Sequence, residues 1–153
     1  MDQSGVRFGT SGARGLAAAM TDQVCYAYTA AFLQHLAAQA EIRHGSRVAL
    51  AGDLRPSTPR ILAACAAAIE DGGYAPVNCG AIPTPAVANW AMREGIASLM
   101  VTGSHIPDDR NGIKFYRPAG EILKADEAAI RARSVSLPGV PTTMSTPLRP
   151  VSL

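Results

Sequence analysis

Stretches of helical periodicity alternate with short apolar runs through most of the chain, and this alternation limits the possible folds more than any other feature. Apolar residues recur every four positions across 22–44, which predicts a helix that Thr21 caps and Gly45 ends. Three further helices are expected: from Ser57 or Thr58 to Gly72-Gly73, from Thr84-Pro85 to Gly95, and over 124–133. Short apolar runs typical of buried strands occupy 47–51, 74–79, 96–101 and 113–116.

This order of elements predicts an α/β protein. We expect a three-layer α/β/α domain over residues 1–133, with a mixed, mostly parallel sheet of about four strands and helices on both faces. Residues 134–153 contain four prolines and no acidic residue. Such a segment buries too little apolar surface to order itself, so it is expected to be a linker toward a domain that this chain lacks.

Composition excludes several classes of protein. A hydrophobic content of 48% with 17% charged residues is typical of a soluble globular protein. The net charge of +2, without a basic cluster, gives no reason to expect a nucleic-acid partner. The longest apolar run, 61–69, is too short to span a membrane, and no signal peptide is visible, so we expect a cytoplasmic protein. Cys25, Cys65 and Cys79 are widely spaced, which favours buried free thiols over disulfides or a zinc site.

The first polar segment of interest is Phe8-Gly9-Thr10-Ser11-Gly12-Ala13-Arg14-Gly15. Its three glycines would let backbone N–H groups approach an anion, and Arg14 would add a forked donor for phosphate. The segment lacks the lysine of a P-loop and the spacing of a dinucleotide site. From these residues alone, a flexible turn is an equally good interpretation.

The segment 102–114 contains Ser104 next to His105. Neighbouring side chains of an extended chain point in opposite directions, so the two are poorly placed to act as nucleophile and base, and no GxSxG motif is present. The alternative is a serine that carries phosphate, which needs cations nearby. The cations available in the sequence are His105, Arg110, Lys114 and Arg14. Asn111-Gly112 could form a turn that brings Lys114 back beside Ser104. Lys114 could carry a proton, supply charge only, or be an ordinary surface lysine.

Other polar residues are assigned structural roles. Asp53 and Arg55 are interpreted as a turn pair, while adjacent Asp108 and Asp109 suit neither acid–base catalysis nor a metal site. A surface or capping role is expected for His35 and His44, and a core or interface position for Trp90.

Four motifs resemble the first domain of the α-D-phosphohexomutases, the phosphomannomutase and phosphoglucomutase family. They are FGTSGARG (8–15), GDLRPSTP (52–59), GAIPTPAV (80–87) and TGSHIPDDRNGIKFY (102–116). They occur in the family's order over most of residues 6–133. Ile106 stands where the family's serine loop usually has asparagine.

The resemblance implies that Ser104 is a phosphoserine that exchanges its phosphoryl group with hexose phosphates. It implies interconversion of mannose or glucose 1- and 6-phosphates through a hexose 1,6-bisphosphate, with phosphoglucosamine as another possible substrate class. Lys114 and Arg14 match positions of proton transfer and phosphate contact, Thr10 and Ser11 join Arg14 at the phosphate, and His105 flanks the nucleophile. Mg²⁺ would bind through the Ser104 phosphate, its other ligands lying in a second domain.

Because the family has four domains, this chain alone is expected to be inactive. Two other hypotheses stay open from the sequence. One is a phosphoacceptor or sugar-phosphate binding module without catalysis, and the more distant one is a serine hydrolase.

Overall fold

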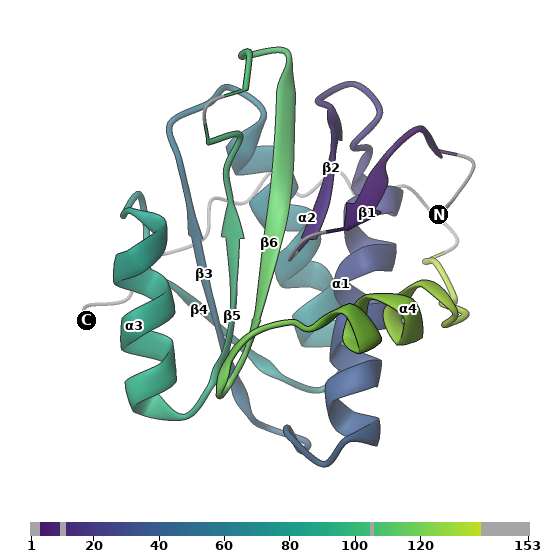
Figure 1. The fold of residues 1–153 in the computed structure, drawn as a ribbon, viewed down its shortest axis with the longest axis vertical. Coiled ribbons are helices and arrows are strands. Elements are labelled where there is room, and N and C mark those ends of the chain that lie inside the picture. Colours follow the sequence, from purple (N-terminus) through teal and green to yellow (C-terminus); the bar gives the residue numbers. More distant parts are fainter. Residues whose placement is uncertain (1–3, 10–11, 105, 139–153) are drawn as a thin grey trace.

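The computed structural model describes residues 4–9, 12–104 and 106–138, and that part of the chain forms seven strands and four helices. Figure 1 shows how the main elements are arranged. The elements in chain order are β1 (Arg7–Gly9), β2 (Gly12–Leu16), α1 (Asp22–Ala38), β3 (Arg47–Gly52), α2 (Thr58–Asp71), β4 (Ala75–Asn78), α3 (Thr84–Glu94), β5 (Ala97–Val101), β6 (Arg110–Arg117), β7 (Gly120–Glu121) and α4 (Lys124–Arg131). All of the predicted helices and strands are present, with shifted ends.

All seven strands belong to one sheet, in the order β1-β2-β6-β5-β3-β4, with β7 paired to β6. β3 runs parallel to β4 and β5, whereas β1–β2, β2–β6, β5–β6 and β6–β7 are antiparallel. The mixed sheet is confirmed. The expectations of about four strands and of mostly parallel pairing are corrected, because the three short strands β1, β2 and β7 add antiparallel pairs.

Helices cover both faces of the sheet, which confirms the three layers. On one face α1, α2 and α4 pack over alternate strand residues such as Leu50, Leu99 and Phe115. On the other face α3, and no other described helix, packs over the intervening residues, among them Ala49 and Met100 (Figure 1). Strands buried on both faces have no solvent-facing side, which explains why β3 and β5 are mainly apolar.

Helix α1 ends at Ala38, six residues before the predicted end. Ala40 takes a left-handed conformation, with φ of 58°, and the Glu41 N–H bonds to the Leu36 carbonyl oxygen at 2.9 Å. This is the bonding pattern that closes a helix C-terminus. At the other end Thr21 caps the helix as predicted, since its Oγ1 accepts from the Val24 N–H at 3.3 Å.

The two histidines assigned to the long helix differ in environment. His44 lies beyond α1 and is exposed. His35 is buried, which corrects the expected surface or capping role, and its Nε2 lies 2.7 Å from Asp126 Oδ1 at the start of α4. The contact joins α4 to α1 and so helps to close the core over Ile130. The predicted buried cysteines are confirmed: all three are free thiols, and burial raises the pKa of each.

Asp126 makes the attachment of α4 sensitive to acid. Burial opposes ionisation of its carboxyl group, but hydrogen bonds from the Leu123 N–H and His35, with the charge of Arg117, outweigh burial and lower its pKa. A lowered pKa contributes stability that is full above the unfolded-state pKa of about 4 and is lost as the pH falls through the folded-state value. We expect the free energy of unfolding of Asp126→Asn to decrease less steeply than that of the wild type as the pH falls below about 4. Urea titrations at several pH values in that range measure this dependence. An unchanged slope would contradict the assignment.

Residues 134–138, the described start of the predicted linker, form neither helix nor strand, and Val135 packs against the core. The rest of that predicted segment lies outside the described residues. Among the described helices, none has the length and apolar character needed to cross a membrane.

Candidate active site

Two of the predicted polar loops meet at the carboxyl ends of neighbouring strands. Because β3 and β5 are parallel neighbours, the residues after Gly52 and Val101 emerge at the same edge of the sheet. The Asp53 N–H bonds to the Val101 carbonyl oxygen at 2.9 Å, and the Thr102 N–H bonds to the Gly112 carbonyl oxygen in β6 at 2.9 Å. The edge formed by β3, β5 and β6 therefore positions the loop that contains Ser104.

Ser104 is exposed and has a φ of 54°, in the left-handed region that serine rarely adopts. Its N–H donates to Thr102 Oγ1 at 3.0 Å, and the preceding Gly103 N–H donates to Asp53 Oδ2 at 3.1 Å. Such a conformation persists only where the surroundings enforce it, and it often occurs at functional sites.

The Arg55 guanidinium lies against the backbone of the Ser104 loop. Its Nε donates to Asp53 Oδ2 at 3.2 Å, and only 11% of its side chain is exposed. The other N–H groups donate to backbone carbonyl oxygens of the loop, those of Ser104 (3.3 Å), Ile106 (2.7 Å), Pro107 (2.7 Å) and Arg110 (3.2 Å). The predicted turn pair exists, since the Arg55 N–H bonds to Asp53 Oδ1 at 3.1 Å, but it also organises a loop far away in the sequence.

The Asp53 carboxylate is fully engaged in this arrangement. Burial opposes its ionisation, yet hydrogen bonds from the Thr58 hydroxyl and from the N–H groups of Arg55 and Gly103 together lower its pKa. The Thr58 bond is the shortest, at 2.6 Å. Asp53 therefore stays charged and holds Arg55 in place.

Asn111 and Gly112 lie within β6, which corrects the predicted turn. Asn111 is fully buried and donates from Nδ2 to Ser57 Oγ at 2.8 Å and to Thr58 Oγ1 at 3.0 Å, at the start of α2. Ser57 thus binds Asn111 and makes no side-chain capping bond to α2. Lys114 still returns to the site, because β6 runs back along β5.

Arg14 and Lys114 lie on the same face of the sheet, in neighbouring strands. Arg14 pairs with Gly112, and Gly12 pairs with Lys114, so both long side chains project toward the face covered by α3. Both line a small cavity of about 10 Å³ with Thr102. Lys114 is half-buried, whereas Arg14 is exposed. Within the described part of the chain, no hydrogen bond or ion pair joins either residue to Ser104.

The glycine-rich first segment is mostly strand. Gly12 and Gly15 lie in β2 and Gly9 ends β1, which corrects the predicted loop for these positions. Thr10 and Ser11, and likewise His105, lie outside the described residues. Arg110 begins β6 and is exposed.

A larger open cavity of about 540 Å³ lies beside Ser104. It is mainly apolar and is lined by the loop after β3, the start of α3 and the start of the Ser104 loop: residues Gly52, Asp53, Leu54, Ala81, Ile82, Pro83, Thr84, Met100, Thr102 and Ser104. Thr102 lines both this cavity and the smaller one with Arg14 and Lys114. Thr102 therefore separates the cavity beside Ser104 from the smaller one that Arg14 and Lys114 line.

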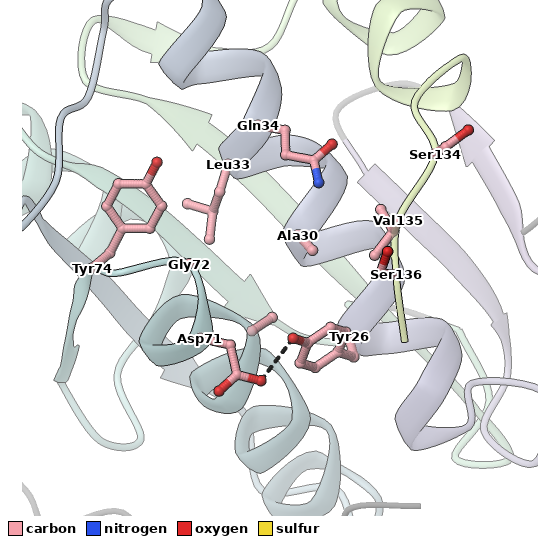
Figure 2. Close-up of a pocket in the computed structure, with 11 residues that line it drawn as sticks. Tyr26, Ala30, Leu33, Gln34, Asp71, Gly72, Tyr74, Ser134, Val135 and Ser136 are labelled. Carbon is pink, nitrogen blue, oxygen red and sulfur yellow. Dashed lines mark hydrogen bonds between the residues drawn. The ribbon is translucent and has the colours of Figure 1, made fainter. Parts of the chain in front are cut away.

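A third cavity, of about 260 Å³, lies between α1, the end of α2 and residues 134–136 (Figure 2). None of the predicted site residues lines it. Its main polar contact joins the Tyr26 hydroxyl to Asp71 Oδ2 at 2.7 Å, and burial followed by this bond raises the pKa of Tyr26 to about 12. This cavity is separate from the Ser104 site.

Sequence reasoning missed the roles of Arg55 and Asn111. A signal for Arg55 was available, because an Asp-x-Arg sequence directly after a buried strand lies at the sheet edge where sites form. Asn111 carried no such signal, since Asn-Gly usually indicates a turn.

Comparison with known proteins agrees with this geometry. A family model described as phosphoglucomutase/phosphomannomutase, alpha/beta/alpha domain I, matches residues 5–136. A phosphomannomutase from Sinorhizobium fredii (strain NBRC 101917 / NGR234) is 50% identical over 133 residues, which are 87% of this chain and 28% of that protein. A phosphoglucosamine mutase from Mycobacterium ulcerans (strain Agy99) is 36% identical over 137 residues, 87% of this chain and 30% of that protein.

Among solved structures, a phosphoglucomutase/phosphomannomutase family protein from Burkholderia thailandensis superposes with a TM-score of 0.71 at 27% identity. The match covers 84% of this chain and 29% of that one. The chain thus spans less than a third of the length of these relatives. With the fold, the Ser104 loop and these matches in agreement, the chain belongs to the phosphoglucomutase/phosphomannomutase family and corresponds to its α/β/α domain I.

Proposed function

We propose that this chain supplies Ser104 as the phosphoryl carrier of a phosphohexomutase that interconverts hexose 6-phosphates and hexose 1-phosphates. The observation that carries the proposal is the presentation of Ser104: an exposed hydroxyl on a left-handed residue, whose loop Arg55 and Asp53 fix at the sheet edge. A carrier serine must be accessible to a substrate and stay in one position through two transfers, and this loop meets both needs.

The proposed chemistry consists of two opposite phosphoryl transfers. In the first, the bond between phosphorus and the Ser104 oxygen breaks, a sugar hydroxyl oxygen binds phosphorus, and the proton of that hydroxyl ends on the Ser104 oxygen. In the second, the Ser104 oxygen binds the phosphorus of the other phosphoryl group of the hexose 1,6-bisphosphate, the bond from that phosphorus to the sugar oxygen breaks, and the serine proton ends on the sugar oxygen. Negative charge spreads over the phosphoryl oxygens during each step, so positioned cations stabilise the transition state.

Lys114 and Arg14 are the cations that we assign to this role. Both face the cavity beside Thr102, and Lys114 is half-buried in β6, where its ammonium group has fewer waters to compete with a phosphate. We propose Lys114 as the proton carrier and Arg14, with Thr10 and Ser11, as contacts for a substrate phosphate. His105 is assigned a flanking role next to the nucleophile.

Magnesium is the cofactor that the family resemblance implies. Over the described residues, no group of three or more His, Cys, Asp or Glu side chains could hold a metal ion, and the Asp53 carboxylate is engaged in structural bonds. By the resemblance, a phosphate on Ser104 would be a ligand of the metal. We therefore derive no step through the metal from these residues.

Mannose phosphate is our proposed substrate, with glucose and glucosamine phosphates as the alternatives. The support is similarity alone: the relative named phosphomannomutase is 50% identical, and the one named phosphoglucosamine mutase is 36% identical. We also propose that residues 1–133 act as one domain, that 134–153 link it to the remainder of a mutase, and that the protein works in the cytoplasm, where sugar phosphates are made.

Mass spectrometry of digests tests the proposal directly. We expect the chain, assayed as part of the mutase whose remaining domains supply the other metal ligands and the sugar site, to carry one phosphoryl group on Ser104 after incubation with glucose 1,6-bisphosphate and Mg²⁺, and none after Ser104→Ala. Ser136→Ala is a matched control, since Ser136 is exposed and lines the separate third cavity. Phosphate on another residue, or equal labelling of the Ser104→Ala chain, would contradict the assignment.

A further inference from the structure

We propose that Arg55 is a positioning residue that holds Ser104 in its left-handed conformation through backbone contacts and does not itself bind the phosphate. The inference rests on the proposed role of Ser104. It concerns an arginine that lies beneath the phosphate carrier and would otherwise be taken for one of its counter-ions.

The hydrogen-bond inventory of the guanidinium carries the first step. An arginine side chain has five N–H donors. All five have acceptors here: Nε bonds to Asp53, Nη1 to the carbonyl oxygens of Pro107 and Arg110, and Nη2 to those of Ser104 and Ile106. Any phosphate contact by Arg55 would cost one of these bonds. We therefore assign the phosphate contacts to other residues.

The second step is the close fit between Arg55 and the loop backbone. A Cβ atom added to Gly103 would overlap the Arg55 guanidinium carbon. The glycine thus lets the guanidinium lie directly against the peptide that precedes Ser104. Residue 106 contacts Arg55 through its backbone carbonyl oxygen. The contact is therefore kept although isoleucine replaces the family's usual asparagine at this position.

The third step is that Arg55 is itself held firmly. Asp53 accepts from the Arg55 N–H and Nε, and the Thr58 hydroxyl fixes the same carboxylate at 2.6 Å. Thr58 begins α2, so a chain of hydrogen bonds runs from that helix to the Ser104 carbonyl. Lysine has three donors on one nitrogen and cannot reproduce a planar fork that serves five acceptors.

Hydrogen exchange on the unphosphorylated chain tests the positioning role. The informative amides are those whose bonds depend on the loop geometry, at Gly103, Ser104, Ile106 and Arg110. We expect Arg55→Lys and Arg55→Ala to speed their exchange at least about tenfold, the effect of losing one charge-assisted hydrogen bond, with β3 and β5 amides unchanged. Arg60→Lys is the matched control, because Arg60 also donates to backbone carbonyls, those of Ala17 and Met20, but away from this loop.

The backbone conformation of Ser104 supplies a second readout. A general loss of stability would leave this conformation unchanged in the folded chain. The N–H to Hα coupling and the Cα chemical shift of Ser104 report its φ. We expect left-handed values in the wild-type and Arg60→Lys chains and averaged values in both Arg55 variants. Wild-type exchange and wild-type shifts in Arg55→Lys would overturn the proposal, since charge alone would then suffice. Faster exchange throughout β3 and β5 would also overturn it, by showing a global role.

These measurements need no phosphate, so they separate the inference from the proposed function. Suppose that hydrogen exchange in the Ser104 loop depends on Arg55 but Ser104 never acquires phosphate. The positioning role of Arg55 would then stand, and the proposed role of Ser104 as phosphoryl carrier would be rejected. If Ser104 acquires phosphate but hydrogen exchange in its loop does not change in the Arg55 variants, only the positioning role of Arg55 would be rejected.

Discussion

Gly12→Ala is expected to destabilise the protein by about 3 kcal/mol or more, at the upper end of the range for overpacking a well-packed site. An added Cβ would overlap the carbonyl oxygen of Ile113 and lie 2.8 Å from its carbonyl carbon and 3.0 Å from the Lys114 Cα. These atoms belong to the backbone of β6, which pairs with β5 on its other side and cannot move aside easily. Strand β2 would have to separate from β6.

The measurement is thermal unfolding, in which such a loss lowers the midpoint by roughly 6–12 °C for a domain of this size. Gly9→Ala is the matched control: it lies in the same hairpin, but a Cβ there meets no described atom within 4 Å. We expect its midpoint to equal that of the wild type. Equal midpoints for both variants would show that β2 does not pack on β6 as described.

The second large effect is expected at Asn111, the buried amide that joins β6 to the start of α2. Asn111→Ala removes the acceptor of the Gly112 N–H and the donor to two hydroxyl groups, those of Ser57 and Thr58. A buried group left without a partner costs about 1–3 kcal/mol, so we expect a total loss of roughly 2–4 kcal/mol. Urea unfolding measures it.

Asn89→Ala is the control for this variant, because Asn89 is exposed on α3. Alanine favours helix over asparagine, so its unfolding free energy should stay within about 0.5 kcal/mol of the wild-type value. A similarly small change at Asn111 would refute the view that its bonds hold the start of α2 against β6.

Much of the fold could be predicted from sequence because its signals are local. The apolar period of α1, the proline-marked starts of α2 and α3 and the apolar runs of β3 and β5 depend only on residues a few positions apart. The Ser104 loop could likewise be recognised as a contiguous motif with its cations at fixed spacing. What the sequence by itself determined is thus the set of main elements and the contiguous family motif to which we assign the chemistry.

The tertiary structure alone decided what depends on distant partners. Strands β1, β2 and β7 are too short and too rich in glycine to show the alternating apolar pattern of a strand in their sequence. They form because β6 pairs with β2 and β7, and β2 in turn pairs with β1. His35 is buried because Asp126, 91 residues further on, lies against it. Arg55 organises a loop 49 to 55 residues away, through backbone carbonyls that every residue type possesses. Because the acceptors are backbone carbonyl oxygens, the sequence can mark Arg55 as a site residue but cannot show which loop it contacts. Only the folded chain shows that the arginine lies beneath the serine.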